Sequence, residues 1–279
     1  MAEARPSSPP GDYVLGTGDD ELLRLGFQHQ VWSAAAAAHW ERARFGPGQT
    51  LLDVGSGPGY ATLDLARLVG PSGKVLAVDR SPGFLNHLEG AAQALGLRQI
   101  QTCLADLAAD GAWIPPGTAH GAYARWVLCF VADPARVIAA VARALRPGGR
   151  FAIADYYRYA AISVAPVSPA FRRVIDAVEV SWGVHGGDPA IGLRLPELLT
   201  QHGFVLEEVR PLIRIAHPGT ALWEWPTTFF RNFLPVLRRA DLITSEDEAA
   251  FARDWAERSR NPAARFFSPP MVEIVATKA

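Results

Sequence analysis

The residues best suited to chemistry begin with a glycine turn behind an apolar run. Residues 51–59 read Leu-Leu-Asp-Val-Gly-Ser-Gly-Pro-Gly, so Gly55, Gly57 and Gly59 stand at every second position after Asp53. Glycine lets the backbone bend sharply and lets a ligand lie against it, and Asp53 places a carboxylate at the end of the expected strand. Apolar residues then recur at helical spacing from residue 61 onward, which predicts strand, turn and helix in succession.

Three kinds of ligand fit such a turn, and the spacing separates them. A phosphate-binding P-loop needs Lys followed by Ser or Thr after its last glycine, but Tyr60 and Ala61 stand there, which excludes it. A dinucleotide fingerprint needs a third glycine where this chain has Tyr60. NAD or FAD therefore stays open as the second choice.

Two further acids follow expected strands. Asp79 ends the run 74–79 and comes 26 residues after Asp53, which is close to the length of a unit whose second strand presents an acid to a ribose. Asp106 follows the run 100–104, where it could accept a hydrogen bond from an adenine amino group. We also expect helices over 82–95 and 135–145, a strand within 121–128, and a fifth strand over 151–154 behind Pro147-Gly148-Gly149.

From residue 50 to 155, the order of these acids, the glycine turn and Leu-Arg-Pro-Gly-Gly resembles class I S-adenosylmethionine (SAM) dependent methyltransferases. The resemblance implies an α/β, Rossmann-like, seven-stranded and mostly parallel sheet with helices on both faces and an antiparallel last strand. It also implies that SAM is the cofactor and that its methionine half lies on the glycine turn. The other cofactor residues implied are Asp53, Asp79, Arg80, Asp106, Leu107, Arg125 and Trp126.

The remaining sequence predicts additions to this core. We expect an N-terminal helical lid (1–49), the SAM-binding core (50–157), a cap insertion (158–192), a continuation of the core (193–216), a second cap insertion (217–267) and the final core strand (268–279). Within the continuation we expect a helix over 195–203 and a strand over 205–215. Because ligands bind beyond the carboxyl ends of the strands, these insertions could form a mainly helical cap over the site.

The N-terminal segment resembles that of one branch of small-molecule methyltransferases. The resemblance places Tyr13, Arg24, Gln28 and Trp32 over the cofactor. The alternative is a surface helix packed through Leu22, Leu25 and Trp32, with Gln28 in solvent.

Composition limits the partners. The formal net charge is −1 and the Arg residues are scattered among acids, which disfavours a nucleic-acid substrate. Cys103 and Cys129 have no metal-ligand spacing, so we expect reduced thiols and no metal site. The first twelve residues lack the apolar core of a signal peptide, and no run is long enough to span a bilayer. We therefore expect a cytoplasmic monomer or homodimer with a small-molecule substrate and no membrane partner.

Transfer from a sulfonium is an in-line displacement, so most of the catalysis can come from positioning the acceptor. His185, in a glycine-flanked loop, is the first candidate base, and its alternative is an exposed loop histidine. Asp155, Tyr156 or Tyr159 could orient an acceptor, while Asp155 could instead be satisfied by backbone N–H groups. His29 and Glu179 are weaker candidates.

Aromatic residues are concentrated in the cap insertions and predict an apolar substrate wall, although ordinary packing is the alternative. The residues concerned are Trp182, Trp223, Trp225, Phe229 and Phe230. The sequence thus predicts methyl transfer to a small aromatic or heteroaromatic metabolite of secondary metabolism. An indole carbon, a phenol oxygen and an amine nitrogen all remain open as acceptors. A nicotinamide-dependent oxidoreductase and a non-catalytic SAM-binding regulator are the other classes.

Overall fold

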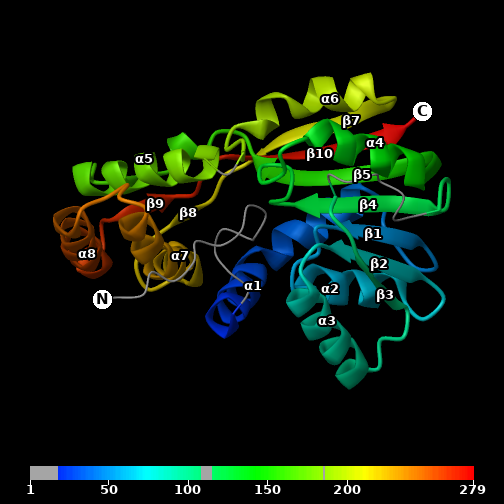
Figure 1. Cartoon of the computed structure of the whole chain (residues 1–279), viewed down its shortest axis with the longest axis horizontal. Coiled ribbons are helices and arrows are strands. Elements are labelled where there is room, and N and C mark those ends of the chain that lie inside the picture. Colours follow the sequence, from blue (N-terminus) through cyan, green and yellow to red (C-terminus); the bar gives the residue numbers. More distant parts are fainter. Residues whose placement is uncertain (1–17, 108–114, 185) are drawn as a thin grey trace, which may run out of the picture.

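The computed structural model describes residues 18–107, 115–184 and 186–279. Its main sheet has seven strands in the order β3-β2-β1-β4-β5-β10-β7 (Figure 1). Strands β1 to β5 are parallel, and β10 runs antiparallel to both of its neighbours. The strands are β1 (Thr50–Val54), β2 (Lys74–Asp79), β3 (Ile100–Leu104), β4 (Ala119–Arg125), β5 (Leu145–Tyr156), β7 (Phe204–Leu212) and β10 (Met271–Lys278). The predicted fold is confirmed, with the strand order reversing between β1 and β4.

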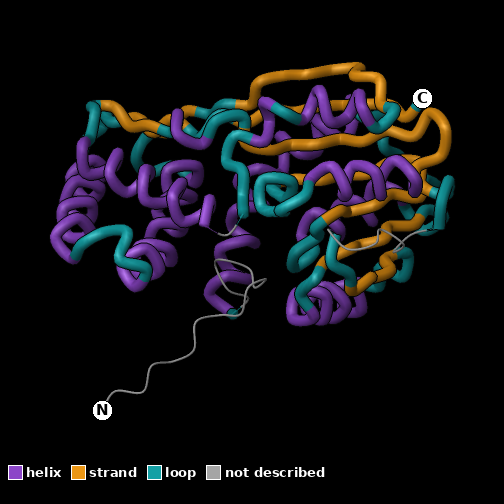
Figure 2. The backbone as a smooth tube through the Cα atoms, turned by 45° about the horizontal axis from the view of Figure 1, so that its top comes forward, coloured by secondary structure: helices purple, strands orange, loops and turns teal. Residues whose placement is uncertain are grey.

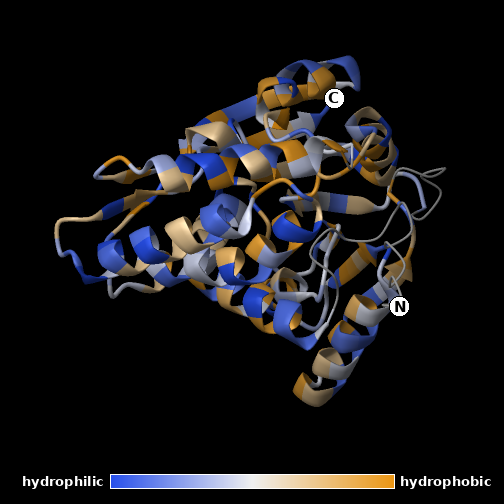
Figure 3. Ribbon diagram, turned by 60° about the vertical axis from the view of Figure 1, so that its left-hand side comes forward, coloured by the Kyte–Doolittle hydropathy of each residue, from blue (hydrophilic) through white to orange (hydrophobic). Residues whose placement is uncertain are grey.

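Helices cover both faces of this sheet because its strands are apolar on both sides. Leu51 and Val75 pack toward α1 and α2, whereas their neighbours Leu52 and Leu76 belong to the cluster on the opposite face. Helices α1 (Asp19–Arg42), α2 (Tyr60–Val69) and α3 (Pro82–Leu95) cover the first face, and α4 (Pro134–Ala144) and α6 (Leu195–Gln201) the second (Figures 1 and 2). The helices carry both hydrophilic and hydrophobic residues along their length (Figure 3), as burial of one side of a helix requires.

The bounds of β4 and β5 have local causes. The expected strand within 121–128 ends at Arg125, because Trp126 adopts the left-handed region with φ 55° and cannot continue a strand. The expected strand over 151–154 was too short, because β5 already pairs with β4 at Leu145 and resumes after a register shift at Arg150. The Pro-Gly-Gly run thus lies inside this irregular part of β5.

The cap combines three helices with a small sheet. Its helices are α5 (Pro169–Val184), α7 (Ala221–Arg239) and α8 (Ser245–Arg260), and its strands are β6 (Ser163–Ala165), β9 (Arg265–Phe267) and β8 (Ile215–Ala216). The 3-10 turns Tyr159–Ala161 and Ile191–Leu193 lie at the two ends of the first insertion. No residue pattern predicts the small sheet, where residues 215–216 pair with β9 instead of extending β7.

The two insertions, far apart in sequence, pack on each other beside the sheet (Figure 1). Phe171 of α5 stacks on Phe251 and Trp255 of α8, with each pair of ring centroids 6.1 Å apart. Burial of large aromatic surfaces stabilises this contact. The cap therefore has a core of its own that holds both insertions in place.

Helix α1 joins the cap to the sheet. The Tyr60 hydroxyl at the start of α2 donates to the Leu22 carbonyl at 3.0 Å, and Trp225 Nε1 of α7 donates to Gln28 Oε1 at 2.9 Å. Acidic residues fill the first turn of α1, where they interact favourably with the helix dipole. Over the ranges that the structure describes, no helix has the length and apolar character to cross a membrane.

Candidate active site

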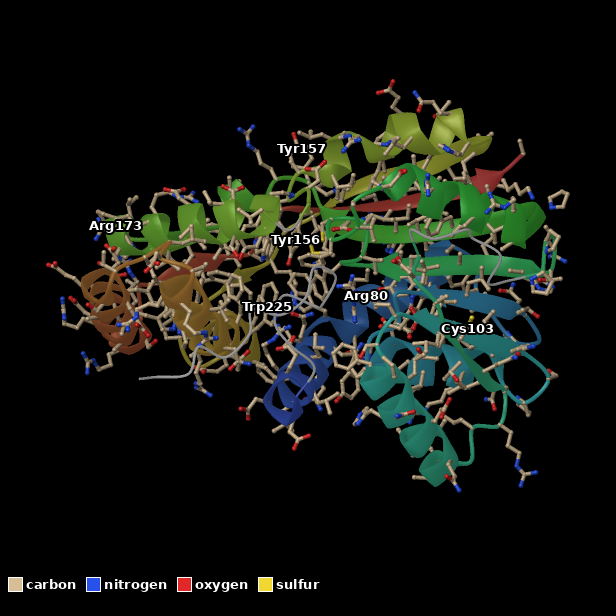
Figure 4. The ribbon with its side chains drawn as sticks, viewed as in Figure 1. Arg80, Cys103, Tyr156, Tyr157, Arg173 and Trp225 are labelled. Atoms are coloured by element: carbon tan, nitrogen blue, oxygen red, sulfur yellow. The ribbon has the colours of Figure 1, made fainter. Side chains whose placement is uncertain are left out.

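One cavity of about 700 Å³ lies at the carboxyl ends of the strands, between the sheet and the cap. Its size is within the range of about 300–1,000 Å³ that is usual for small-molecule sites. It is lined by α1, the glycine turn, the segments after β2 to β5, and the cap. Three of its residues, Arg80, Tyr156 and Trp225, are labelled in Figure 4, where they lie between sheet and cap.

Two parts of the lining differ in chemistry. We call the first the turn half, which comprises Asp53, 55–58, Tyr60, Ala61, 79–84, Asp106, Leu107, Tyr123, Arg125 and Val127, with Arg24, Leu25, Gln28 and His29 of α1. We call the second the cap half, which comprises 130–132, Tyr156, Tyr159, Ile162, Trp182, Trp225, Pro226, Phe229, Phe230, Phe266 and Pro269. Trp126 lies in the lining between them.

The three glycines of the turn have different roles. All have positive φ: 68° for Gly55, 54° for Gly57 and 85° for Gly59. A Cβ atom on Gly55 would come within 2.6 Å of Val127, and one on Gly59 within 2.3 Å of Leu88, so both positions are needed for close packing. A Cβ on Gly57 would meet nothing within 4 Å, and Gly57 lines the cavity. Gly57 is therefore where a ligand can approach the backbone, whereas Gly59 lies outside the lining.

Asp79 connects the glycine turn to the end of β2. Its Oδ2 accepts a hydrogen bond from the Gly57 N–H and its Oδ1 accepts one from the Ser81 N–H, both at 2.8 Å. Burial raises the pKa of Asp79, while these donors oppose the shift. Each carboxylate oxygen can accept a second hydrogen bond, so Asp79 can also bind a ligand that carries two hydroxyls.

Asp53 is almost completely buried and accepts a hydrogen bond from the Thr62 hydroxyl at 2.6 Å. Burial raises the pKa of Asp53 to about 6, and the positive charge of Arg125 partly counters it. Arg80, Asp106 and Leu107 line the same half of the cavity. The structure thus brings Asp53, Asp79 and Asp106 to one cavity, as the sequence predicted.

A chain of hydrogen-bonded side chains leads from the turn half to the surface of α2. Arg125 Nη2 donates to His29 Nδ1 at 2.9 Å, and His29 Nε2 lies 2.9 Å from Asp64. Because arginine can only donate, neutral His29 must carry its proton on Nε2 and donate it to Asp64. Arg125 also lies 4.9 Å from the centre of the Trp126 ring. Arg125 therefore lines the cavity, and His29 holds its side chain in position.

Arg24 lies on the face of α1 that lines the cavity, and hydrogen bonds fix its side chain. Its guanidinium contacts both carboxylate oxygens of Glu21, at 2.7 and 2.6 Å, and donates to Gln28 at 3.1 Å. Both members of this ion pair are buried. Arg24 is thus matched by Glu21, and Gln28 bonds both Arg24 and Trp225.

Aromatic side chains form most of the cap half. Tyr156 stacks on Trp182 with ring centroids 5.7 Å apart, and Tyr159 lies 4.5 Å from Trp182. Trp225 stacks on Trp126 at 6.1 Å. Of the substrate residues expected from sequence, Tyr159, Trp182, Trp225, Phe229 and Phe230 line the cavity, as does Tyr156.

Sequence reasoning missed several residues of the lining. Phe130 follows β4 at the same edge as Trp126, so its position after a strand end could have identified it. Phe266 belongs to the small cap sheet, which no sequence signal indicated. Tyr60 was considered only as an obstacle to dinucleotide binding, but it lines the cavity and holds α1.

The catalytic role expected of Asp155 is not supported. Its side chain is completely buried outside the lining. Oδ2 accepts from the backbone N–H groups of residues 127–129 at 2.9–3.2 Å, and Oδ1 accepts from Tyr156 N at 2.8 Å. Backbone N–H groups thus satisfy the Asp155 carboxylate, which was the alternative expectation. Its role is to hold the segment after β4 against the end of β5.

Two predicted tryptophans also lie outside the main cavity. Trp223 stacks on Trp255 at 4.8 Å and donates to Ser259 at 3.1 Å, so it packs within the cap. Trp32 is 1% exposed and packs against Trp126 and Trp225 from behind the cavity wall. Tyr13 and His185 fall outside the residues that the structure describes.

Comparison with known proteins agrees with this geometry. Residues 52–153 match the family model described as a methyltransferase domain. The demethylmenaquinone methyltransferase of Symbiobacterium thermophilum is 35% identical over 154 residues, covering 53% of this chain and 61% of the relative. The trans-aconitate 2-methyltransferase of Methylobacterium radiotolerans is 28% identical over 273 residues, covering 89% of this chain and 98% of the relative.

A solved structure is similar in fold over most of the chain. The geranyl diphosphate C-methyltransferase of Streptomyces coelicolor A3(2) superposes with a TM-score of 0.58 at 16% identity, covering 90% of this chain and 77% of that one. For several curated relatives the alignment spans only 46–61% of the relative's own length. The part that matches the family model, residues 52–153, contains the glycine turn and β2, β3 and β4. Residues 52–153 are therefore a methyltransferase domain of the class I SAM-dependent type, whose cofactor is S-adenosyl-L-methionine.

Proposed function

We propose that this protein is an enzyme that transfers a methyl group from SAM to a small aromatic or heteroaromatic metabolite. The observation that carries the proposal is one continuous cavity with two different halves. The turn half offers carboxylates and bare backbone to a nucleoside, and the cap half offers aromatic faces to an apolar acceptor. A site for two reactants in contact is what direct transfer requires.

In this proposal the turn half holds the cofactor. Asp79 accepts hydrogen bonds from the ribose hydroxyls, and Asp106 and Leu107 hold the adenine. Gly55, Gly57 and Asp53 face the methionine end of the cofactor. Arg125 and Gln28 lie beside it. His29 fixes the side chain of Arg125, and Trp225 fixes that of Gln28. The contacts that support this assignment are the accessible Gly57 backbone and the carboxylates that line the same half.

SAM supplies a sulfonium whose S–CH₃ bond breaks as the acceptor bonds the methyl carbon, so that the electron pair stays on sulfur and the acceptor then loses a proton. The protein aligns the acceptor with that bond and excludes water. Aromatic faces such as those of Trp126, Tyr156 and Trp225 also stabilise the cationic centre by about 0.5–2 kcal/mol per good contact.

The acceptor atom stays a proposal with three options. An indole carbon can attack before losing a proton and needs no strong base, whereas a phenol or an amine gains from one. His185 remains the proposed base, and Tyr156 and Tyr159 remain proposed contacts of the acceptor. If carbon is methylated, His185→Ala should spare much of kcat. A large loss with intact SAM binding favours oxygen or nitrogen transfer.

Two measurements together test the function. Calorimetry should detect binding of S-adenosylhomocysteine and no binding of NAD(H). Mass spectrometry should detect a gain of one methyl group when SAM is incubated with panels of indoles, phenols and aromatic amines. Preferred binding of NAD(H) would favour an oxidoreductase. If the protein binds SAM but the complex leaves no space for an acceptor in the cap half, a non-catalytic regulator would be favoured.

We also propose the lid, core and cap boundaries given by the sequence, with residues 215–216 assigned to the cap sheet. Secondary metabolism and the cytoplasm are proposed on the sequence argument alone, as is a monomeric or homodimeric assembly.

A further inference from the structure

The cap half contains two buried tyrosine hydroxyls that form no hydrogen bond with the residues that the structure describes. The side chains of Tyr156 and Tyr159 are 7% and 3% exposed. Within the described part of the chain, neither hydroxyl has a hydrogen-bond partner. The Tyr123 hydroxyl, in contrast, is sealed from solvent, and those of Tyr156 and Tyr159 are not. Both residues line the cavity, and we infer that it is the space that each hydroxyl faces.

Both tyrosines are fixed in position by their neighbours. Their rings contact each other edge to face at 5.1 Å, and both contact Trp182. Burial raises the pKa of each phenol above its ordinary value, so both stay protonated at neutral pH. Two neutral, rigid donors thus face one space, and a buried donor left without a partner is costly. A ligand that supplies a partner gains specificity at this position.

The rest of the cap half is uncharged. Its described residues are aromatic, aliphatic, proline or alanine, and they include no Asp, Glu, Lys, Arg or His. Two cations outside the cap half act on the tyrosines, and both are paired: Arg24 with Glu21 at 2.6 Å, and Arg172, which acts on Tyr159, with Asp176 at 2.9 Å. Glu179 adds a negative charge near Tyr159. An anionic acceptor would be desolvated here without a free counter-charge, which is strongly unfavourable.

Resting on the function proposed above, we propose that the acceptor is a neutral, planar aromatic molecule with an oxygen substituent, of the phenol, quinol or aromatic ketone class. The hydroxyls of Tyr156 and Tyr159 hold this oxygen. The faces of Trp182, Trp225 and Phe229 hold the ring, and the position to be methylated points toward the turn half. This preference separates the protein from relatives whose names specify anionic substrates, trans-aconitate and geranyl diphosphate.

The test uses the full chain saturated with S-adenosylhomocysteine and three probes of one shape: 2-naphthol, naphthalene and 2-naphthoate. Calorimetry at pH 8 should show that 2-naphthol binds about tenfold more tightly than naphthalene, as one to two hydrogen bonds allow. The anion 2-naphthoate should bind at least about tenfold more weakly than 2-naphthol. These ratios are measured in the wild-type protein and do not depend on any variant folding.

Variants then assign the effect to the two hydroxyls. Tyr156→Phe combined with Tyr159→Phe should reduce the preference for 2-naphthol over naphthalene to less than about twofold, because both donors are gone. Affinity for S-adenosylhomocysteine should change little. Tyr157→Phe is the matched control, since Tyr157 is 46% exposed and lies outside the lining (Figure 4).

Three results would overturn the inference: equal binding of 2-naphthoate and 2-naphthol, an unchanged preference in the double variant, or no binding of either neutral probe at millimolar concentration. Failure of the proposed function gives a different result, namely that S-adenosylhomocysteine itself does not bind.

Discussion

The two halves of the cavity are built in different ways. The turn half comes mostly from short segments directly after β1, β2, β3 and β4, with one face of α1 added. The cap half collects residues from position 130 to position 269, and its walls meet only because α5, α7 and the small sheet pack together. The cofactor residues are thus encoded locally, whereas the acceptor residues depend on tertiary packing. Changes in the two halves should therefore have separable effects.

The largest expected effect is in the turn half, at Asp79. Asp79→Ala removes the proposed ribose acceptor and also the two hydrogen bonds that hold Gly57 and Ser81. We expect a loss of about 1–3 kcal/mol in affinity for S-adenosylhomocysteine, or roughly 5- to 150-fold. Calorimetry measures it, and Asp176→Ala on the exposed side of α5 is the control. Unchanged affinity in a folded Asp79→Ala protein would remove the ribose assignment.

A methyl group on the glycine turn should have the next largest effect. Gly57→Ala places a Cβ on the cavity side of the turn, where we expect about tenfold weaker binding of S-adenosylhomocysteine through steric overlap. Gly96→Ala is the control because Gly96 also has positive φ, 67°, has open space around its Cβ position and lies outside the lining. Equal affinity in the two variants would show that Gly57 does not face the cofactor.

A pH effect should also be specific to the turn half. Asp53 has a pKa raised to about 6 by burial, so free Asp53 is protonated below pH 6 and ionised above it. A cationic cofactor beside it favours the carboxylate, which lowers the pKa on binding. Affinity for SAM should therefore rise with pH up to about pH 6, by up to about tenfold per pH unit, and level off above it.

The variant Asp53→Asn should flatten this dependence, since the amide does not titrate. Calorimetry in buffers of different ionisation enthalpy should also detect protons released on binding at pH 6 by the wild-type protein. A profile that is equally steep in Asp53→Asn would assign the titration to another group.

The smallest effect should come from the junction between the halves. Gln28→Leu removes the acceptor for Trp225 Nε1 and Arg24, and we expect a loss of about 1 kcal/mol in the free energy of unfolding. Gln30→Leu, at an exposed position on the same helix, should change it little. Chemical denaturation measures both. Equal stability of the two variants would mean that α1 is not fastened to the cap through Gln28.

The same division separates the predictable residues from the others. The glycine turn and Asp79 are correctly placed from the sequence because the residues directly after a parallel strand lie at the carboxyl edge of the sheet. The cap is less predictable, as Trp223 and Trp225 illustrate. Two residues apart on one helix, they point about 200° apart, so one lines the cavity and the other packs inside the cap. Helical periodicity predicts this difference, but only the tertiary packing decides which tryptophan faces the cavity.

Asp155 shows a second limit. An acid at a strand end next to the ligand edge reads in sequence like Asp79, yet the segment after β4 folds back so that its backbone N–H groups surround the Asp155 carboxylate. The path of that segment depends on the left-handed conformation of Trp126. Such a conformation is rare for a large side chain, and no sequence pattern indicates it.

A crystal structure of the protein with S-adenosylhomocysteine tests the central claim most directly. The account predicts the ribose hydroxyls within hydrogen-bond distance of Asp79 and the adenine beside Asp106 and Leu107. It also predicts that the sulfur lies next to Trp126 and faces the cap half. A nucleoside bound in the cap half, or outside the cavity altogether, would contradict it.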